Sequence, residues 1–250
     1  MSAGLSNNQS GQFQHFMVYP AIDIESSNLS TSRGQSDGAI ADINSLLSAL
    51  GDAGLSKVHL VDLDLAFSRG ENYKLMAEII STSDLWFQVS GGVRDFQVVE
   101  RYLKLKVGRI NLDPSWLTRP TELGQLIDLC AQYFDNCEFA LAIDIEADQV
   151  KSRGTGEVFG LWRELIPNIP EIISHVIVTD NSRDGKMSGV KLDFYREINE
   201  LVKQQVIASG GVSSISDLIE LKKLGLSGAI VGKAIYSGAI TLKELADVII

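Results

Sequence analysis

The tetrapeptide SGGV occupies residues 90–93 and returns at residues 209–212, an offset of 119 residues (209 − 90). Two aspartates within the pattern A-I-D-I, Asp23 and Asp144, lie 121 residues apart (144 − 23). Two unrelated glycine turns are one explanation. A repeated half-domain explains both matches together and predicts two halves of about four similar units each.

Eight short apolar runs follow one another along the chain, and two of them end in the glycine pairs. We expect strands at MVYPAID (17–23), KVHLVDLD (57–64), LWFQVSGG (85–92), GRINL (108–112), EFALAID (138–144), SHVIVTD (174–180), QVIASGG (205–211) and GAIVG (228–232). Amphipathic stretches between them predict helices at 38–53, 95–106, 119–134, 192–204, 214–224 and 241–249. Nearly continuous apolar strands that alternate with helices indicate a parallel sheet buried on both faces. Eight such units predict an α/β fold, a closed (β/α)8 TIM barrel, in preference to an open doubly wound sheet.

Length and composition fit one such barrel. The chain has 250 residues, of which 45% are hydrophobic, and this is enough for a full core. Residues 1–14 are rich in Ser, Asn, Gln and Gly, which predicts a flexible tail. We therefore expect a single domain over residues 15–250, without a linker.

Charge and cysteine usage restrict the partners and the compartment. A net charge of −10 argues against nucleic acid, whose binding needs clustered Lys and Arg. The sequence has no stretch of membrane-span length and no signal-peptide order at its start. Cys130 and Cys137 lack metal-ligand or redox spacing and are expected to stay reduced, which favours the cytoplasm.

Active sites of TIM barrels lie at the carboxyl ends of the strands. The polar residues expected there are Asp23, Asp62, Asp144, Thr179, Asp180 and Asp184. Asp62, Asp64 and Asp180 are equally explained as helix caps. Asp23 has no helix close behind it to cap, whereas Asp184, followed by Gly185, is also compatible with an ordinary turn.

Glycines after the last two strands predict a phosphate site. Gly210-Gly211 and Gly232-Lys233 allow the backbone to approach a phosphate closely, and the segment 233–238 fits the short extra helix that often completes such sites. The first half repeats the pair as Gly91-Gly92, but the offset of 119 places Asp113-Pro114 where the second half has Gly232-Lys233. Proline donates no N–H and aspartate repels phosphate, so we expect one working phosphate site and one disabled copy.

Several longer blocks resemble a known family. PAIDI, HLVDLDLAFSRGEN, SGGVRD, VTDNSRDGKMSG, VIASGGVSS and GAIVGKAIYSGAITL are similar to the sugar isomerases of histidine biosynthesis, and most of all to the actinobacterial phosphoribosyl isomerase A family, which also serves tryptophan biosynthesis. The resemblance runs from about residue 17 to the C-terminus. It implies a TIM barrel of the ribulose-phosphate-binding type.

The resemblance implies an Amadori rearrangement, in which an aminoaldose becomes an aminoketose by acid–base catalysis. It places the base on Asp23 and the acid on Asp184. Residues that match family positions lining the substrate are His59, Ser90, Arg94, Asp144, Arg153 and Thr179. Gly189 joins Gly210, Gly211, Gly232 and Lys233 in the implied phosphate site. We expect no metal and no organic cofactor, a small phosphorylated substrate, no membrane partner and a monomer.

The chain departs from the family pattern in three places. Thr31 stands where the family has a loop arginine, and Arg33 is an open candidate to replace it. Thr155 stands where the family has a tryptophan, and Asp113-Pro114 replaces a Gly-Thr.

These departures bear on the substrate. The histidine-pathway substrate has two phosphates, whereas phosphoribosylanthranilate, of the tryptophan pathway, has one phosphate and a carboxylate that Arg153 is placed to hold. The altered site favours phosphoribosylanthranilate isomerase. Alternatives are a bifunctional or histidine-pathway isomerase, with a second phosphate site rebuilt from Arg33, Lys151 or Arg94, and a non-catalytic barrel that binds a phosphorylated metabolite. A related cyclase barrel would need an ammonia-supplying partner, and PAID and HLVDLD argue against it.

Overall fold

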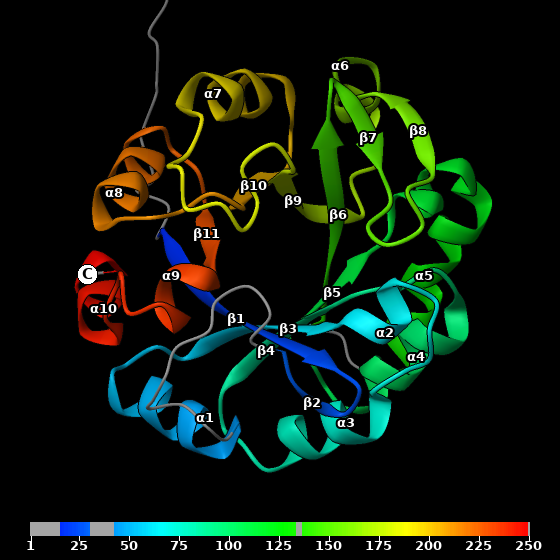
Figure 1. Cartoon of the computed structure of the whole chain (residues 1–250). Helices are drawn as coiled ribbons and strands as arrows, with labels where there is room; N and C mark the ends of the chain where they lie inside the picture. The colour runs from blue at the N-terminus through cyan, green and yellow to red at the C-terminus, as the bar shows by residue number, and fades with distance from the viewer. Residues whose placement is uncertain (1–15, 31–42, 134–136, 250) are drawn as a thin grey trace, which may run out of the picture.

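The computed structural model describes residues 16–30, 43–133 and 137–249. Eight parallel strands close into a barrel, which confirms the fold predicted from the sequence (Figure 1). In order around the barrel they are β1 (Met17–Glu25), β3 (Lys57–Asp62), β4 (Trp86–Ser90), β5 (Arg109–Leu112), β6 (Glu138–Glu146), β9 (Ile173–Asp180), β10 (Gln205–Ser209) and β11 (Gly228–Val231). The barrel closes where β11 pairs with β1, with Met17 beside Gly228 and Pro20 beside Val231.

Helices form a ring around the strands in Figure 1. Those between or after barrel strands are α1 (Ile43–Asp52), α3 (Tyr73–Ser81), α4 (Phe96–Lys104), α5 (Pro120–Tyr133), α7 (Leu192–Leu201), α8 (Ile215–Lys223) and α10 (Leu242–Ile249). The half-repeat extends to their caps. Asp95 accepts a hydrogen bond from the N–H of Val98 at the start of α4, and Ser214, 119 residues later, caps α8 through Asp217.

Shorter elements lie in the connections between the strands. They are β2 (Asn28–Leu29), α2 (Leu63–Ala66), η1 (Pro114–Thr118), β7 (Gln149–Lys151), β8 (Val158–Leu161), α6 (Trp162–Leu165), η2 (Ile166–Asn168) and α9 (Lys233–Tyr236). Helix α9 confirms the extra helical turn expected after the last strand. The antiparallel hairpin of β7 and β8, which continues from β6, was not predicted.

Strand side chains alternate between two environments, as the pleat requires. Those facing outward pack against the helices in one large apolar core, which includes Ile110 and Leu112 of β5. Those facing into the barrel form a smaller apolar cluster of Tyr19, Ala140, Ile177, Ile207 and Ile230. Polar inward residues, Arg109 and Asn111 among them, interrupt that cluster on the β4–β6 side.

Three expectations lie partly or wholly outside the described residues. The predicted tail at 1–14 and the loop residues Thr31 and Arg33 fall in segments that the structure does not describe. The helix expected over 38–53 is described from Ile43 onward. Across the described ranges, no helix has both the length and the apolar character needed to cross a bilayer.

Cys130 and Cys137 are free thiols, as expected. Burial raises the pKa of the Cys137 thiol far above its ordinary value, which disfavours the reactive thiolate.

Candidate active site

Two pockets open at the carboxyl ends of the barrel strands, and they meet at Ser209. The first pocket is lined by Ala21, Asp23, Ser30, Asp184, Gly185, Met187, Ser209, Gly210, Gly211, Val212, Ile230, Gly232, Lys233 and Tyr236. The second pocket is lined by His59, Val61, Ser90, Gly91, Gly92, Val93, Asn111, Leu112, Asp113, Ala142, Asp144, Arg153, Ile177, Thr179 and Ser209. Of the thirteen site residues proposed from the sequence, eleven therefore line one of two adjoining cavities.

The two pockets are the two copies of the half-repeat. The offset of 119 pairs six residues of the second pocket with six of the first. The pairs are Ser90 with Ser209, Gly91 with Gly210, Gly92 with Gly211, Val93 with Val212, Asn111 with Ile230 and Asp113 with Gly232. Asp144 of the second pocket corresponds to Asp23 of the first at the offset of 121. The pockets thus share a backbone plan and differ in chemistry where the repeats differ.

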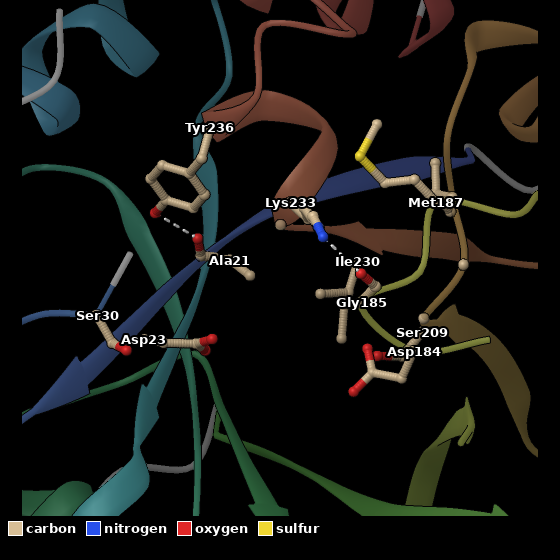
Figure 2. Close-up of a pocket in the computed structure, with 14 residues that line it drawn as sticks. Ala21, Asp23, Ser30, Asp184, Gly185, Met187, Ser209, Ile230, Lys233 and Tyr236 are labelled. Atoms are coloured by element: carbon tan, nitrogen blue, oxygen red, sulfur yellow. Dashed lines mark hydrogen bonds between the residues drawn. The ribbon is translucent and has the colours of Figure 1, made fainter. Parts of the chain in front are cut away.

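Asp23 and Asp184 face the first pocket from opposite sides in Figure 2. Asp23 lies on β1, in register with Val61 of β3. Asp184 lies in the loop after β9, where its N–H donates to the carbonyl of Asp180 at 2.9 Å. The sequence prediction that these two carboxylates share one cavity is consistent with this arrangement.

Tyr236 closes the same pocket beside Asp23. Its hydroxyl donates to the carbonyl oxygen of Ala21 at 2.8 Å (Figure 2). Burial, and then the charge of Asp23, raise the pKa of Tyr236 far above its ordinary value, so the phenol stays protonated. Sequence reasoning did not single out Tyr236.

The residues expected to hold phosphate surround the start of α9. Gly232 is the N-cap residue of α9, and the Lys233 ammonium donates to the carbonyl of Gly185 at 2.9 Å. The carbonyl of Gly189 lies beside Gly211, although Gly189 itself is not one of the pocket-lining residues that the structure describes. Its role in phosphate binding stays a prediction.

The paired glycines also have a structural reason that the sequence did not reveal. A Cβ atom on Gly211 would lie 2.9 Å from the carbonyl oxygen of Gly189, and one on Gly210 would lie 3.2 Å from the Cα of Asp184. In the first half, a Cβ on Gly91 would lie 2.2 Å from the carbonyl oxygen of Asp62. Each pair therefore lets the loop of the preceding strand pack closely, whether or not a phosphate binds.

Arg153 connects the two pockets electrostatically. Its Nε donates to Asp144 Oδ2 at 3.0 Å, and its terminal Nη2 donates to Asp184 Oδ2 at 3.2 Å. Burial by itself lowers the pKa of Arg153, but the charges of Asp144 and Asp184 outweigh burial and raise it above its ordinary value. Arg153 is thus engaged by two carboxylates, and its expected contact with substrate stays a prediction.

Arg94 takes no part in lining either pocket among the described residues and instead ties loops together. Its guanidinium donates to the carbonyls of Ala66 at 2.9 Å and Arg153 at 3.0 Å, and its Nε lies 3.2 Å from Asp113 Oδ2. Such a residue positions the loops around the second pocket. Its direct contact with substrate is a prediction that this arrangement does not support.

Two other aspartates at strand ends hold the backbone that follows them. Asp62 accepts from the N–H of Leu65 at the start of α2, and from Asn72, while fully buried. Asp180 accepts from the N–H and hydroxyl of Ser182. The helix-cap alternative weighed from the sequence therefore holds for Asp62 and is wrong for Asp180, because the next helix, α7, begins only at Leu192.

Two polar residues of the second pocket escaped sequence reasoning. Asn111 and Ser209 both line it, and Asn111 lies two residues after Arg109 on β5, on the same inward face. The period-two pattern of GRINL was the available signal, since it points Asn111 into the barrel. Among the described residues, no cluster of His, Cys, Asp and Glu has an arrangement that could hold a metal ion.

Comparison with known proteins shows which family the chain resembles. Residues 17–241 match the family described as histidine biosynthesis protein. A relative from Saccharopolyspora erythraea, named 1-(5-phosphoribosyl)-5-((5-phosphoribosylamino)methylideneamino)imidazole-4-carboxamide isomerase, is 35% identical over 238 residues, which cover 92% of this chain and 97% of the relative. A relative with the same name from Arthrobacter sp. (strain FB24) is 38% identical over 202 residues, 79% of each chain. Phosphoribosyl isomerase A of Mycobacterium sp. (strain JLS) is 35% identical over 237 residues, 91% of this chain and 94% of the relative.

Proposed function

The chain belongs to the histidine biosynthesis protein family and is an isomerase, and we propose that it converts a phosphoribosylated aminoaldose into the aminoketose through Asp23 and Asp184. The observation that carries this proposal is that both carboxylates face one pocket from opposite sides. In the proposed reaction, Asp184 gives a proton to the ring oxygen as the furanose opens, and Asp23 removes the proton from C2. Ring opening leaves an imine at C1, and loss of the C2 proton turns it into an enolamine. When C1 is reprotonated and the C2 hydroxyl loses its proton, C2 becomes the ketone carbonyl without net oxidation.

The phosphate of the substrate anchors at the start of α9 in this proposal. Backbone N–H groups near Gly232 and the ammonium of Lys233 offer hydrogen-bond donors and positive charge against the net charge of −10. Lys233 already spans the pocket to Gly185, on the loop that carries Asp184. Phosphate binding and placement of the acid are therefore linked through one side chain.

The second pocket supports a substrate with a single phosphate. At the position that corresponds to Gly232, it presents the buried carboxylate of Asp113. One oxygen of Asp113 accepts from the Ser152 hydroxyl at 2.5 Å and lies 3.2 Å from Arg94 Nε, and the other accepts from the N–H of Ser115 at 3.0 Å. The donors that an incoming phosphate needs there are already used by a fixed negative group, which repels it. We propose phosphoribosylanthranilate as the substrate.

The names of the relatives support a second candidate. The isomerases of Saccharopolyspora erythraea and Arthrobacter are named for a compound that carries two phosphoribosyl groups and a carboxamide. A chain that keeps this activity would have to bind the second phosphate away from Asp113. The two candidates share the aspartates and the chemistry and differ only in what the second pocket holds.

Steady-state assays on both substrates test the proposal. We expect kcat/KM for phosphoribosylanthranilate to exceed that for the two-phosphate substrate by more than about tenfold, which is ~1.4 kcal/mol in transition-state binding.

Asp23→Asn and Asp184→Asn should each lower kcat by at least about 100-fold, the usual contribution of a positioned acid or base, while the melting temperature stays near that of the wild type. Comparable kcat/KM values for the two substrates would refute the substrate choice, and an active variant would refute the assignment of the acid and the base.

A further inference from the structure

Asn111 lies in the second pocket with its polar atoms unsatisfied. It is 1% exposed, and neither its Nδ2 nor its Oδ1 has a hydrogen-bond partner among the described residues. Buried amides in folded proteins nearly always have partners, so such a group needs a ligand or an ordered water to complete it. The corresponding residue of the first pocket is Ile230, which needs none.

His59 lines the same pocket, and a chain of hydrogen bonds that begins at Arg109 sets its tautomer. Arg109 Nη1 donates to Gln88 Oε1 at 2.8 Å, and because a guanidinium only donates, this bond orients the Gln88 amide. The Gln88 Nε2 then faces His59 Nδ1 at 3.0 Å, so Nδ1 is the acceptor. A neutral His59 consequently carries its proton on Nε2, the ring nitrogen away from Gln88.

A buried guanidinium, paired with an exposed carboxylate, holds this chain of contacts in place. Arg109 is 2% exposed and donates to Glu138 Oε2 at 2.6 Å through Nη2. The same Nη2 lies 3.0 Å from His175 Nε2. The guanidinium cannot turn without breaking its hydrogen bonds to Gln88 and Glu138, so the barrel itself sets the tautomer of His59.

We propose that Asn111, with the Nε2–H of His59 in the same pocket, binds the planar acyl group on the ring of the substrate's amine half. The inference rests on the proposed function, because it takes the amine half to occupy the second pocket while the sugar phosphate occupies the first. A carboxylate accepts from Nδ2 of Asn111 and from His59. A carboxamide accepts from His59 and pairs with both polar atoms of Asn111. Asn111 is thus a specificity-determining residue for either candidate substrate.

A double-mutant cycle between enzyme and substrate tests the contact. Asn111→Leu keeps the size and removes both polar atoms, and the substrate partner of the cycle is phosphoribosylaniline, which lacks the carboxylate of phosphoribosylanthranilate. We expect wild-type kcat/KM to favour the carboxylate substrate by at least about tenfold, mostly through KM, and Asn111→Leu to abolish that preference. Asn199→Leu is the matched control, because the one hydrogen bond of Asn199 among the described residues goes to the carbonyl of Leu224 at 3.3 Å, outside both pockets. The control should keep the wild-type preference.

Asn111→Asp separates the two kinds of acyl group. The new carboxylate repels a substrate carboxylate and still accepts from a carboxamide. We expect kcat/KM for phosphoribosylanthranilate to fall at least about 100-fold, and that for the two-phosphate carboxamide substrate to fall less than about tenfold. Equal losses on phosphoribosylanthranilate and phosphoribosylaniline in Asn111→Leu would overturn the proposal, because they would assign Asn111 to an ordered water or to folding.

A binding experiment separates failure of this inference from failure of the proposed function. Titration of the protein with benzoate or benzamide should shift the side-chain amide NMR signal of Asn111 and leave that of Asn199 unchanged. A shift without turnover of either phosphoribosyl substrate would contradict the proposed function and support the acyl site. Turnover with no shift from either probe and no change of preference in Asn111→Leu would leave the function standing and overturn the acyl site.

Discussion

Asp113→Asn tests whether one carboxylate keeps a second phosphate out of the barrel. The substitution preserves size and removes a buried negative charge from the end of β5. A phosphate at roughly 5 Å from that carboxylate is opposed by about 3 kcal/mol per unit charge at an effective dielectric constant of ~20, and salt and solvent reduce this. We therefore expect kcat/KM for the two-phosphate substrate to rise about tenfold or more, equivalent to ~1.4 kcal/mol. The value for phosphoribosylanthranilate should change less than about threefold.

The same substitution has a stability cost that can be measured independently. Asp113 accepts from Ser152 and neutralises Arg94, whose side chain is 23% exposed and keeps part of its solvation. Loss of the charge should destabilise the fold by about 1–2 kcal/mol, less than for a fully buried pair. For a chain of this size the melting temperature should drop by about 2–8 °C. Kinetic assays at 25 °C therefore compare folded enzymes.

Asp193→Asn is the control, because this exposed carboxylate on α7 pairs only with Arg196 among the described contacts. It should leave both kcat/KM values unchanged. A two-phosphate activity that does not increase in Asp113→Asn, despite the lower melting temperature, would show that the charge is not the barrier. The double variant Asp113→Gly with Pro114→Thr then asks whether the missing backbone N–H is the obstacle.

Three further outcomes are expected. Lys233→Met should raise KM for the phosphorylated substrate at least about tenfold and weaken inhibition by inorganic phosphate, because it removes a charged donor of the first pocket. Treatment with a metal chelator should leave activity unchanged, and loss of turnover would contradict the cofactor-free reaction. Burial lowers the pKa of His175 to about 4. Because the unfolded chain takes up this proton near pH 6.5, the free energy of unfolding should fall as the pH drops from about 6.5 toward 4, and His175→Gln should reduce that slope in denaturant titrations.

The sequence predicted the barrel because the strands are short apolar runs and helical periodicity follows six of the eight. All eight strands appear within a few residues of their expected positions. The hairpin of β7 and β8 was missed because residues 149–161 are mostly polar or glycine-interrupted, and their pairing depends on the long β6 that they extend. Local pattern carries no information about an extension that exists only in the context of a neighbouring strand.

The candidate site was predicted where chemistry follows from position in the chain. The repeat offset and the strand ends located Asp23, Asp144 and the glycine pairs. The role of Arg94 was not accessible, because its bonds go to backbone carbonyls and to Asp113, which no spacing rule connects with it. Asn111 was passed over because a polar residue in an apolar run does not say whether the fold supplies a partner.

The tight packing of the glycines decides how mutations of the phosphate site can be interpreted. A methyl group on Gly210 would press on the backbone of Asp184, and one on Gly211 would press on the carbonyl of Gly189. An alanine at either position displaces the loop that carries the acid, whatever it does to phosphate. An inactive Gly210→Ala enzyme would therefore say as much about the position of a proton donor as about an anion. Only Gly232, whose added Cβ would meet nothing closer than the Cβ of Ala21 at 3.6 Å, allows the two effects to be measured separately.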